Sequence, residues 1–196
     1  MAFESPSMRT VLVTERLTLR PPRASDVAGY LAALRRNEAH LRPWSPLRVG
    51  DGRRVTLATV SRDVAVARAS WRRDEAYTFL FWQRDEPDVV GRLTLGRVIR
   101  GPFQNAFLGY WVDAAAQGKG MMTEAVRAAV SFAFGPLGLH RVQASIMPRN
   151  LASVRVVTKA GFRNEGRSAR YLQIAGKWED HDIFALTRED WSEAAG

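Results

Sequence analysis

The stretch that decides the fold is Leu108-Gly-Tyr-Trp-Val112-Asp-Ala-Ala-Ala-Gln117-Gly118-Lys-Gly120-Met-Met-Thr-Glu-Ala-Val-Arg127. It predicts a buried strand that closes at Val112, a tight turn with two glycines, and an amphipathic helix directly after the turn. The start of a helix leaves backbone N–H groups without partners and carries about half a positive charge. Glycines there allow positive φ and let a phosphate approach the backbone closely. The stretch therefore predicts a phosphate-binding turn.

The spacing within this turn excludes two common nucleotide-binding motifs. A P-loop needs Gly-Lys followed by Ser or Thr, whereas Lys119 is followed here by Gly120 and Met121. A dinucleotide-binding turn needs a third glycine where this chain has Thr123, and an acidic residue at ribose distance, which this sequence lacks. The phosphate that binds here is therefore expected to belong to another kind of ligand.

Residues 117–122 resemble the Gln/Arg-x-x-Gly-x-Gly/Ala loop of the GNAT superfamily of acetyl-CoA-dependent N-acetyltransferases. In that family the loop wraps the pyrophosphate of coenzyme A. This sequence departs from the pattern at Met122, where the family has Gly or Ala. The resemblance implies a set of acetyl-CoA-binding residues in and before the loop, namely Trp111, Val112, Gln117, Gly118, Lys119, Gly120, Met121 and Met122.

A second motif, Met147-Pro-Arg-Asn150-Leu-Ala-Ser153, follows further along the chain and ends with Gly161-Phe162. It predicts a strand over Arg141 to Ile146, a stop at the proline, and a short helix that Asn150 caps and Gly161 ends. The pattern is similar to the second GNAT signature, in which the Asn contacts the pantetheine arm. The resemblance implies that Asn150 and Ser153 bind the cofactor and that Ser153 protonates the leaving thiolate. The tyrosine that often does so in the family is replaced here by Val157.

The closing segment, from Tyr171 to Leu186, predicts a long hairpin that turns at Ala175-Gly176. Together with the two motifs, it looks like the RimJ/RimL-type branch of the superfamily, whose named members acetylate the N-termini of ribosomal proteins. The resemblance runs from about Thr14 to Trp191. It implies an α/β protein with the GNAT fold, in which helices flank a central mixed, mostly antiparallel sheet, and a single domain over residues 1–196.

The remaining elements are predicted from periodicity and from residues that start and stop helices. The helix after the glycine turn carries an apolar stripe that we assign to the core: Met122, Ala125, Val126, Ala129, Val130 and Ala133. The other predictions are a strand over Val11–Arg20, a helix from a Ser25 cap to Arg36, a polar connection over Asn37–Gly52, a helix over Arg54–Trp71, and strands over Tyr77–Trp82, Val89–Leu95 and Phe107–Val112.

Two segments are candidates for the acceptor site. Glu38, His40 and Trp44 lie in the polar connection, which lines the acceptor cleft in GNAT folds; the alternative is a solvated loop with one anchoring Trp. In the hairpin, a two-residue turn would pair Tyr171 with Asp180 on one face. The next residue, His181, would then point to the other face, so Asp180 and His181 are not expected to act as a dyad.

Composition excludes several classes of chemistry. The chain has 196 residues, of which 46% are apolar, and no cysteine, so disulfides, cysteine-based metal sites and a thiol nucleophile are all excluded. No metal is expected. No apolar run has membrane-spanning length and the N-terminus lacks a signal region, which predicts a cytoplasmic protein without a membrane partner. The net charge of +9 comes from scattered arginines without interleaved aromatic residues, so nucleic acid is expected as a partner only through the ribosome.

The mechanism expected from the resemblance is direct transfer of acetyl from acetyl-CoA to a primary amine in a ternary complex. In the family, the strand that ends at Val112 splays from the strand at Ala144-Ser145-Ile146, and the freed N–H of Val112 serves the thioester oxygen. An α-amine, whose pKa is about 7.7–8.0, needs less help from a base than a Lys side chain at about 10.4. This favours the N-terminus of a protein, possibly a ribosomal one, as the acceptor. Two alternatives stay open: a small amine such as a polyamine, amino acid or antibiotic, and a non-catalytic acetyl-CoA-binding, ribosome-associated module. The sequence leaves monomer and homodimer equally open.

Overall fold

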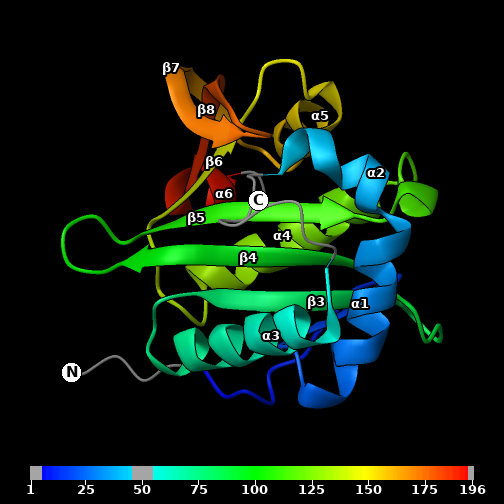
Figure 1. The fold of residues 1–196 in the computed structure, drawn as a ribbon. Coiled ribbons are helices and arrows are strands. Elements are labelled where there is room, and N and C mark those ends of the chain that lie inside the picture. The colour runs from blue at the N-terminus through cyan, green and yellow to red at the C-terminus, as the bar shows by residue number, and fades with distance from the viewer. Residues whose placement is uncertain (1–5, 46–54, 194–196) are drawn as a thin grey trace.

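The computed structural model describes residues 6–45 and 55–193, which form one eight-stranded sheet with helices on both faces (Figure 1). The strand order is β1-β2-β3-β4-β5-β6-β8-β7, and every neighbouring pair is antiparallel except the parallel pair β5–β6. The predicted mixed, mostly antiparallel sheet is therefore confirmed. The strands are β1 Leu12–Val13, β2 Leu17–Arg20, β3 Tyr77–Gln83, β4 Val89–Ile99, β5 Asn105–Val112, β6 Arg141–Ile146, β7 Arg163–Ile174 and β8 Lys177–Thr187.

The sheet divides the core into two clusters, one on each face, because alternate residues of a strand face opposite sides of the sheet. On β3, Phe79 and Phe81 pack with α4, while Leu80 packs with α1 and α3. Figure 1 shows α3 in front of the sheet and α4 behind it. The helices are α1 Val27–Arg36, α2 Glu38–Leu41, α3 Leu57–Arg72, α4 Met121–Phe134, α5 Leu151–Lys159 and α6 Arg188–Glu193.

The phosphate-binding turn has the predicted local structure. After β5 the chain makes a short 3₁₀ turn, Ala114–Ala116, and α4 begins at Met121 directly after Gly120. Gly118 and Gly120 have φ of 71° and 78°, in the left-handed region that suits glycine. The apolar stripe of α4 is buried as predicted: Met122, Ala125, Val126, Ala129, Val130 and Ala133.

The second motif is also confirmed. The strand β6 has the predicted bounds, and Asn150 caps α5 because its Oδ1 accepts a hydrogen bond from the Ser153 N–H at 3.2 Å. Gly161, just past the end of α5, has a φ of 96°. The two motifs thus place the start of α4 and the start of α5 beside the same strands, β5 and β6.

The single strand predicted over Val11–Arg20 is wrong. The chain turns within it, and Leu12 pairs with Leu19 in an antiparallel hairpin. Glu124, far along the sequence in α4, holds this turn: its Oε1 accepts hydrogen bonds from the Thr14 hydroxyl at 2.5 Å and from the Arg16 N–H at 2.9 Å. Apolar and polar residues alternate in the same way whether this stretch forms one strand or two. The turn depends on the distant contact with Glu124, which the sequence pattern does not record.

Two predicted helix starts also differ from the structure. Ser25 does not cap the first helix; instead, the Asp26 carboxylate accepts hydrogen bonds from the Arg23 N–H and the Arg20 guanidinium, and α1 begins after a 3₁₀ turn at Ala24–Asp26. The helix predicted from Arg54 begins at Leu57. Its cap is Thr56, whose hydroxyl oxygen accepts from the Thr59 N–H at 3.2 Å. Arg54 itself lies outside the described residues.

The polar connection predicted over Asn37–Gly52 is partly helical. It contains α2 and a 3₁₀ turn at Arg42–Trp44, while residues 46–52 lie outside the described residues. The predicted acceptor residues Glu38, His40 and Trp44 therefore belong to two short helical turns rather than to a loop.

The hairpin β7–β8 turns at Ala175-Gly176 as predicted, and next to the turn Leu172 pairs with Glu179. Beyond that point the register shifts: Ser168 pairs with His181, so β7 advances four positions, from 172 to 168, while β8 advances two. The two additional residues of β7 form a bulge, which the alternation of residues in the sequence does not reveal.

This bulge contradicts the predicted arrangement of the hairpin side chains. Tyr171 lies in the bulge and does not pair with Asp180, whose Oδ1 accepts a hydrogen bond from the Arg170 N–H at 2.8 Å. The Tyr171 ring lies 5.7 Å from the ring of buried His181, so the two are not separated on opposite faces. The His181 Nδ1 lies 3.0 Å from the Glu179 carbonyl oxygen, so Asp180 and His181 form no dyad.

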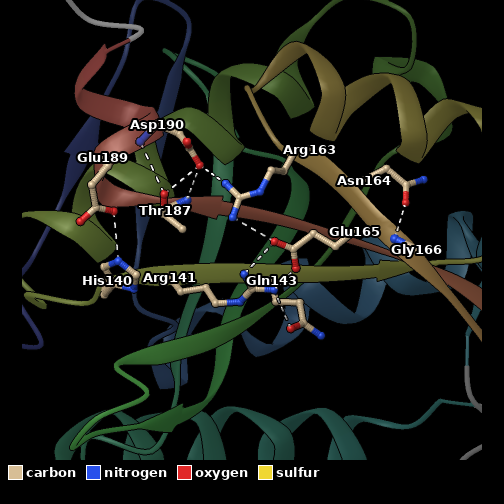
Figure 2. Close-up of polar contacts among 10 residues, drawn as sticks. All are labelled: His140, Arg141, Gln143, Arg163, Asn164, Glu165, Gly166, Thr187, Glu189 and Asp190. Carbon is tan, nitrogen blue, oxygen red and sulfur yellow. Dashed lines mark hydrogen bonds and ion pairs between the residues drawn. The ribbon is translucent and has the colours of Figure 1, made fainter.

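Ion pairs connect β6, β7 and α6 at the end of the sheet where β5 and β6 are paired (Figure 2). Arg141 at the start of β6 holds Glu165 of β7, and Arg163 of β7 bridges Glu165 and Asp190. The hydrogen bond from Arg141 is the main reason why the pKa of Glu165 lies below its usual value. These contacts fasten β7 and α6 to the sheet at this end, and β5 and β6 separate at the other end.

Candidate functional site

The site begins where β5 and β6 part. Their parallel pairing runs from Asn105–Arg141 to Phe107–Gln143 and goes no further among the described residues, although β5 continues to Val112. On the other side of β5, the Asp113 N–H donates to the Val90 carbonyl of β4 at 2.8 Å. Bonded and non-bonded positions alternate along an antiparallel pair, so the Val112 N–H points away from β4. It is therefore directed into the gap between β5 and β6.

A cavity of about 520 Å³ occupies this gap. Its wall is built from the end of β5, the turn that follows it, the start of α4, one side of α5, and α2 with its 3₁₀ turn. It brings together predicted residues from both motifs and from the acceptor segment: His40, Trp44, Trp111, Val112, Gln117, Gly118, Gly120, Met121, Met122, Asn150 and Ser153.

Four predicted site residues do not line this cavity. Lys119 is exposed, and its carbonyl oxygen accepts a hydrogen bond from Arg16 at 2.7 Å. Glu38 is exposed on α2. Tyr171 and Asp180 lie in the hairpin and contact His181 and Arg170 instead.

The acidic residue in the first turn of α4 does not repel an anion that binds there, because its charge is already paired. Glu124 stands in its first turn, but its carboxylate is engaged by Thr14 and by Arg16, whose Nη2 lies 2.6 Å away. Burial alone would raise the pKa of Glu124, yet the hydrogen bonds from Thr14 and Arg16 lower it below its usual value. The carboxylate stays ionised and paired with Arg16, so its charge does not oppose an anion at the N–H groups near Gly120.

The sequence argument missed two cations of the cavity wall, Arg155 and Lys159. They stand one helical turn apart on α5, and both line the cavity. Both side chains are exposed, and neither forms an ion pair among the described residues. Their spacing of four residues, in a helix capped by Asn150, was the available signal that the two cations share one face of α5.

Tyr110 is a second residue that the sequence argument missed. Its hydroxyl donates a hydrogen bond to the Ser153 carbonyl oxygen at 3.2 Å and so links β5 to α5 across the cavity. Burial raises the pKa of the Tyr110 phenol well above its usual value. The phenol therefore stays protonated near neutral pH and serves as a hydrogen-bond donor.

The segment over α2 and its 3₁₀ turn is tied to both sides of the cavity. On one side His40 Nε2 lies 3.1 Å from the Gln117 side-chain nitrogen of the glycine turn. On the other, the Arg149 guanidinium lies over the Trp44 ring, 5.3 Å from its centroid. Arg149 also forms an ion pair with Glu179 of the hairpin at 2.6 Å. At the hairpin turn, the Ala175 N–H donates to the Ser45 carbonyl at 3.3 Å. These contacts join the segment beside the cavity to the hairpin β7–β8, and we call the connection the arch.

If Ser153 is the proton donor that the sequence predicts, its replacement with alanine is expected to lower kcat by about 10-fold or more, because general acid catalysis contributes about 10²–10⁴. Steady-state kinetics with acetyl-CoA and a saturating amine measure the effect. Ser131→Ala on the exposed side of α4 is the matched control for removing a serine hydroxyl from a helix. A kcat within twofold of the unmodified protein would assign thiolate protonation to another group.

Comparison with known proteins places the chain in a family. Residues 16–163 match the family model described as an acetyltransferase (GNAT) domain. The chain therefore belongs to the GNAT acetyltransferase family.

Its relatives lie in the RimJ/RimL-type branch. The chain is 36% identical over 180 residues to the probable N-acetyltransferase YjcK of Bacillus subtilis, covering 92% of this chain and 98% of the relative. It is 33% identical over 184 residues to the ribosomal protein uS5-alanine N-acetyltransferase of Escherichia coli, covering 92% of each. The solved structure of Mycobacterium smegmatis RimJ in complex with CoA-disulfide is 32% identical, with a TM-score of 0.83 over 89% of this chain and 83% of that chain. The predicted fold and the class of reaction, acetyl-CoA-dependent N-acetyl transfer, are confirmed.

The residues that the structure describes, 6–45 and 55–193, bear on membrane insertion and on metal binding. No helix in these ranges is both long and apolar enough to cross a membrane. Nor do these ranges contain three or more His, Cys, Asp or Glu side chains grouped so that they could hold a metal ion.

Proposed function

We propose that this protein transfers acetyl from acetyl-CoA to the N-terminal α-amine of a protein, with a ribosomal protein as the acceptor. The observation that carries the proposal is the arch beside the cavity, formed by Trp44, Arg149 and Glu179 and by the contact of Ser45 with Ala175. An extended chain end can enter beneath such an arch, whereas an internal lysine carries chain on both sides. The relative from Escherichia coli, which is named for alanine N-acetylation of protein uS5, supports the same acceptor class.

The charge of the cavity wall also supports an α-amine. Among the described residues that line the cavity, none is Asp or Glu, and His40 is the one imidazole. A site with little help from a base suits an amine that is already partly neutral. At pH 7 an α-amine with a pKa of about 7.7–8.0 is about one-tenth neutral, whereas a Lys side chain at about 10.4 needs roughly 4–5 kcal/mol to deprotonate.

The proposed roles of the residues follow from their places in the cavity. The glycine turn and the N-terminus of α4 hold the phosphates, with Arg155 and Lys159 facing them, and Asn150 holds the pantetheine arm. The amine nitrogen attacks the thioester carbon while the Val112 N–H stabilises the oxyanion. The carbon–sulfur bond then breaks, and the thiolate takes the proton of Ser153 Oγ. The serine regains a proton from the acetylated ammonium through solvent.

The proposed acceptor also determines where the enzyme acts. Acetylation of ribosomal proteins places it in the cytoplasm, with nucleic acid near it only through the ribosome. We propose that residues 1–196 act as one catalytic domain, as a monomer or a homodimer. The acceptor side includes Glu38, Tyr171 and Asp180, which border the arch rather than line the cavity. A small amine, the other acceptor class, would need no arch.

The rate of N-terminal acetylation is expected to rise modestly between pH 7 and 8 and to level near the pKa of the acceptor's own α-amine. A lysine acceptor would keep gaining to pH 9 and beyond. The measurement is kcat/KM against pH for an Ala-initiated peptide with blocked lysines, beside an N-blocked peptide with one free Lys. Faster turnover of the second peptide, or of a polyamine over both, would contradict the proposed acceptor and leave the acetyltransferase class intact.

A further inference from the structure

The end of β5 lacks a partner strand on one side. Beyond Phe107 its pairing with β6 has ended, so only β4 holds the backbone that carries Val112. A strand end that is paired on one side frays more readily than one paired on both, because it has fewer hydrogen bonds to lose. The direction of the Val112 N–H therefore depends on what else fixes this strand end.

A buried asparagine supplies that second anchor. Asn37, at the junction of α1 and α2, is 1% exposed, and both of its amide atoms are bonded. Its Oδ1 accepts from the Ala114 N–H at 2.8 Å, while its Nδ2 donates to the Ala33 carbonyl at 2.9 Å and to the Asp113 carboxylate at 2.8 Å. Asn37 thus holds the two residues that directly follow Val112.

Asp113 and Arg36 complete the network. The Asp113 carboxylate is buried and accepts hydrogen bonds from Arg36 Nε at 2.5 Å and from the Ala115 N–H at 2.9 Å. Arg36 also donates to the Val89 carbonyl of β4 at 2.7 Å. Burial alone would raise the pKa of Asp113, but the hydrogen bonds from Asn37 and Arg36 lower it, so the carboxylate stays ionised. The network joins α1 to β4 and to the end of β5.

We propose that Asn37 and Asp113 are positioning residues for acetyl transfer: they fix the end of β5 so that the Val112 N–H is directed at the thioester oxygen. The same fixed segment leads into the glycine turn, but the N–H groups proposed to bind the phosphates belong to α4, which begins at Met121, and not to Val112. The proposal rests on the proposed role of Val112 and is independent of which amine is the acceptor.

The test compares Asn37→Ala and Asp113→Asn with Asp26→Asn. Asp26 is a matched control because its carboxylate, 8% exposed, is likewise held by an arginine and a backbone N–H, but at the start of α1 and away from the cavity wall. The measured quantities are kcat with whichever amine is turned over fastest, the KM of that amine, the affinity for acetyl-CoA by calorimetry, and the melting temperature.

Both variants are expected to lower kcat by about 10-fold, short of the 10²–10³ that follows complete loss of an oxyanion donor. Affinity for acetyl-CoA should stay within about twofold, and Asp26→Asn should keep its kcat despite a similar loss of stability. The proposal is overturned if kcat falls no further than in the control, or if the loss appears in the KM of the amine alone.

A milder variant covers the case in which these two do not fold. Arg36→Lys keeps the charge and the aliphatic stem of a side chain that is 37% exposed, but a lysine cannot bond Asp113 and the Val89 carbonyl as the guanidinium does. We expect kcat to fall about threefold at unchanged affinity for acetyl-CoA. An unchanged kcat in a folded Arg36→Lys protein would count against the network, whichever amine is acetylated.

Discussion

Replacing Gly120 with glutamate is expected to lower the affinity for acetyl-CoA by about 100-fold or more, equivalent to about 2.7 kcal/mol. The substitution adds bulk and negative charge where we propose that N–H groups at the start of α4 bind the pyrophosphate. Gly120 has a φ of 78°, and a Cβ there would lie 3.4 Å from the Arg16 guanidinium. Calorimetry on the folded variant measures the loss.

The control for this experiment is Gly120→Ala. Alanine carries the same left-handed strain, about 1 kcal/mol, without the charge or the length of glutamate. We expect it to bind acetyl-CoA several-fold more weakly than the natural protein and far better than the glutamate variant. Equal affinity in all three proteins would remove the phosphate from this turn.

The second large effect is expected at Gly91, which lies opposite Val112 on β4. A Cβ built on Gly91 would lie 2.1 Å from Phe81 and 2.6 Å from the carbonyl oxygen of Trp111. The phenyl ring is fully buried and the carbonyl is backbone, so neither can move away cheaply. Gly91→Val should therefore destabilise the fold by about 3 kcal/mol or more, because overpacking a core displaces backbone and side chains.

Gly109→Ala is the control for that substitution. Gly109 lies on β5, and a Cβ there has no neighbouring atom within 4 Å. Its free energy of unfolding, measured by urea denaturation, should stay within about 0.5 kcal/mol of the natural protein. If Gly91→Val proved equally stable, the close approach of β4 to the end of β5 would be refuted.

The sequence predicted those parts of the site that depend on neighbouring residues. Gly120 followed by an apolar helical stripe defines the turn and α4, and Asn150 with Gly161 defines both ends of α5. These signals work because a helix cap or a left-handed glycine acts within a few residues of itself. The order of the two motifs then indicated the family and, with it, the sheet.

The parts that the sequence could not predict depend on contacts between distant residues. The break in the first strand is set by Glu124, and the anchor of β5 joins Asn37 to Asp113. No periodicity records which distant partner satisfies a buried side chain. Tyr110 could not be assigned to the site for a related reason. It is one aromatic residue in an apolar strand, and the sequence does not distinguish it from a core residue until the gap beside β5 is known.

The bulge between Ser168 and Leu172 bears on how such an enzyme can change over evolutionary time. It adds two residues to β7, and because side chains alternate, the residues on either side of it keep their faces. A second shift, between Asn164 and Gly166, adds one residue to the same strand. The neighbouring β8 keeps an unbroken register with β6 from Asp182 to Thr187. Residues can thus be inserted into the outer strand β7 while the pairing of the inner strands is kept.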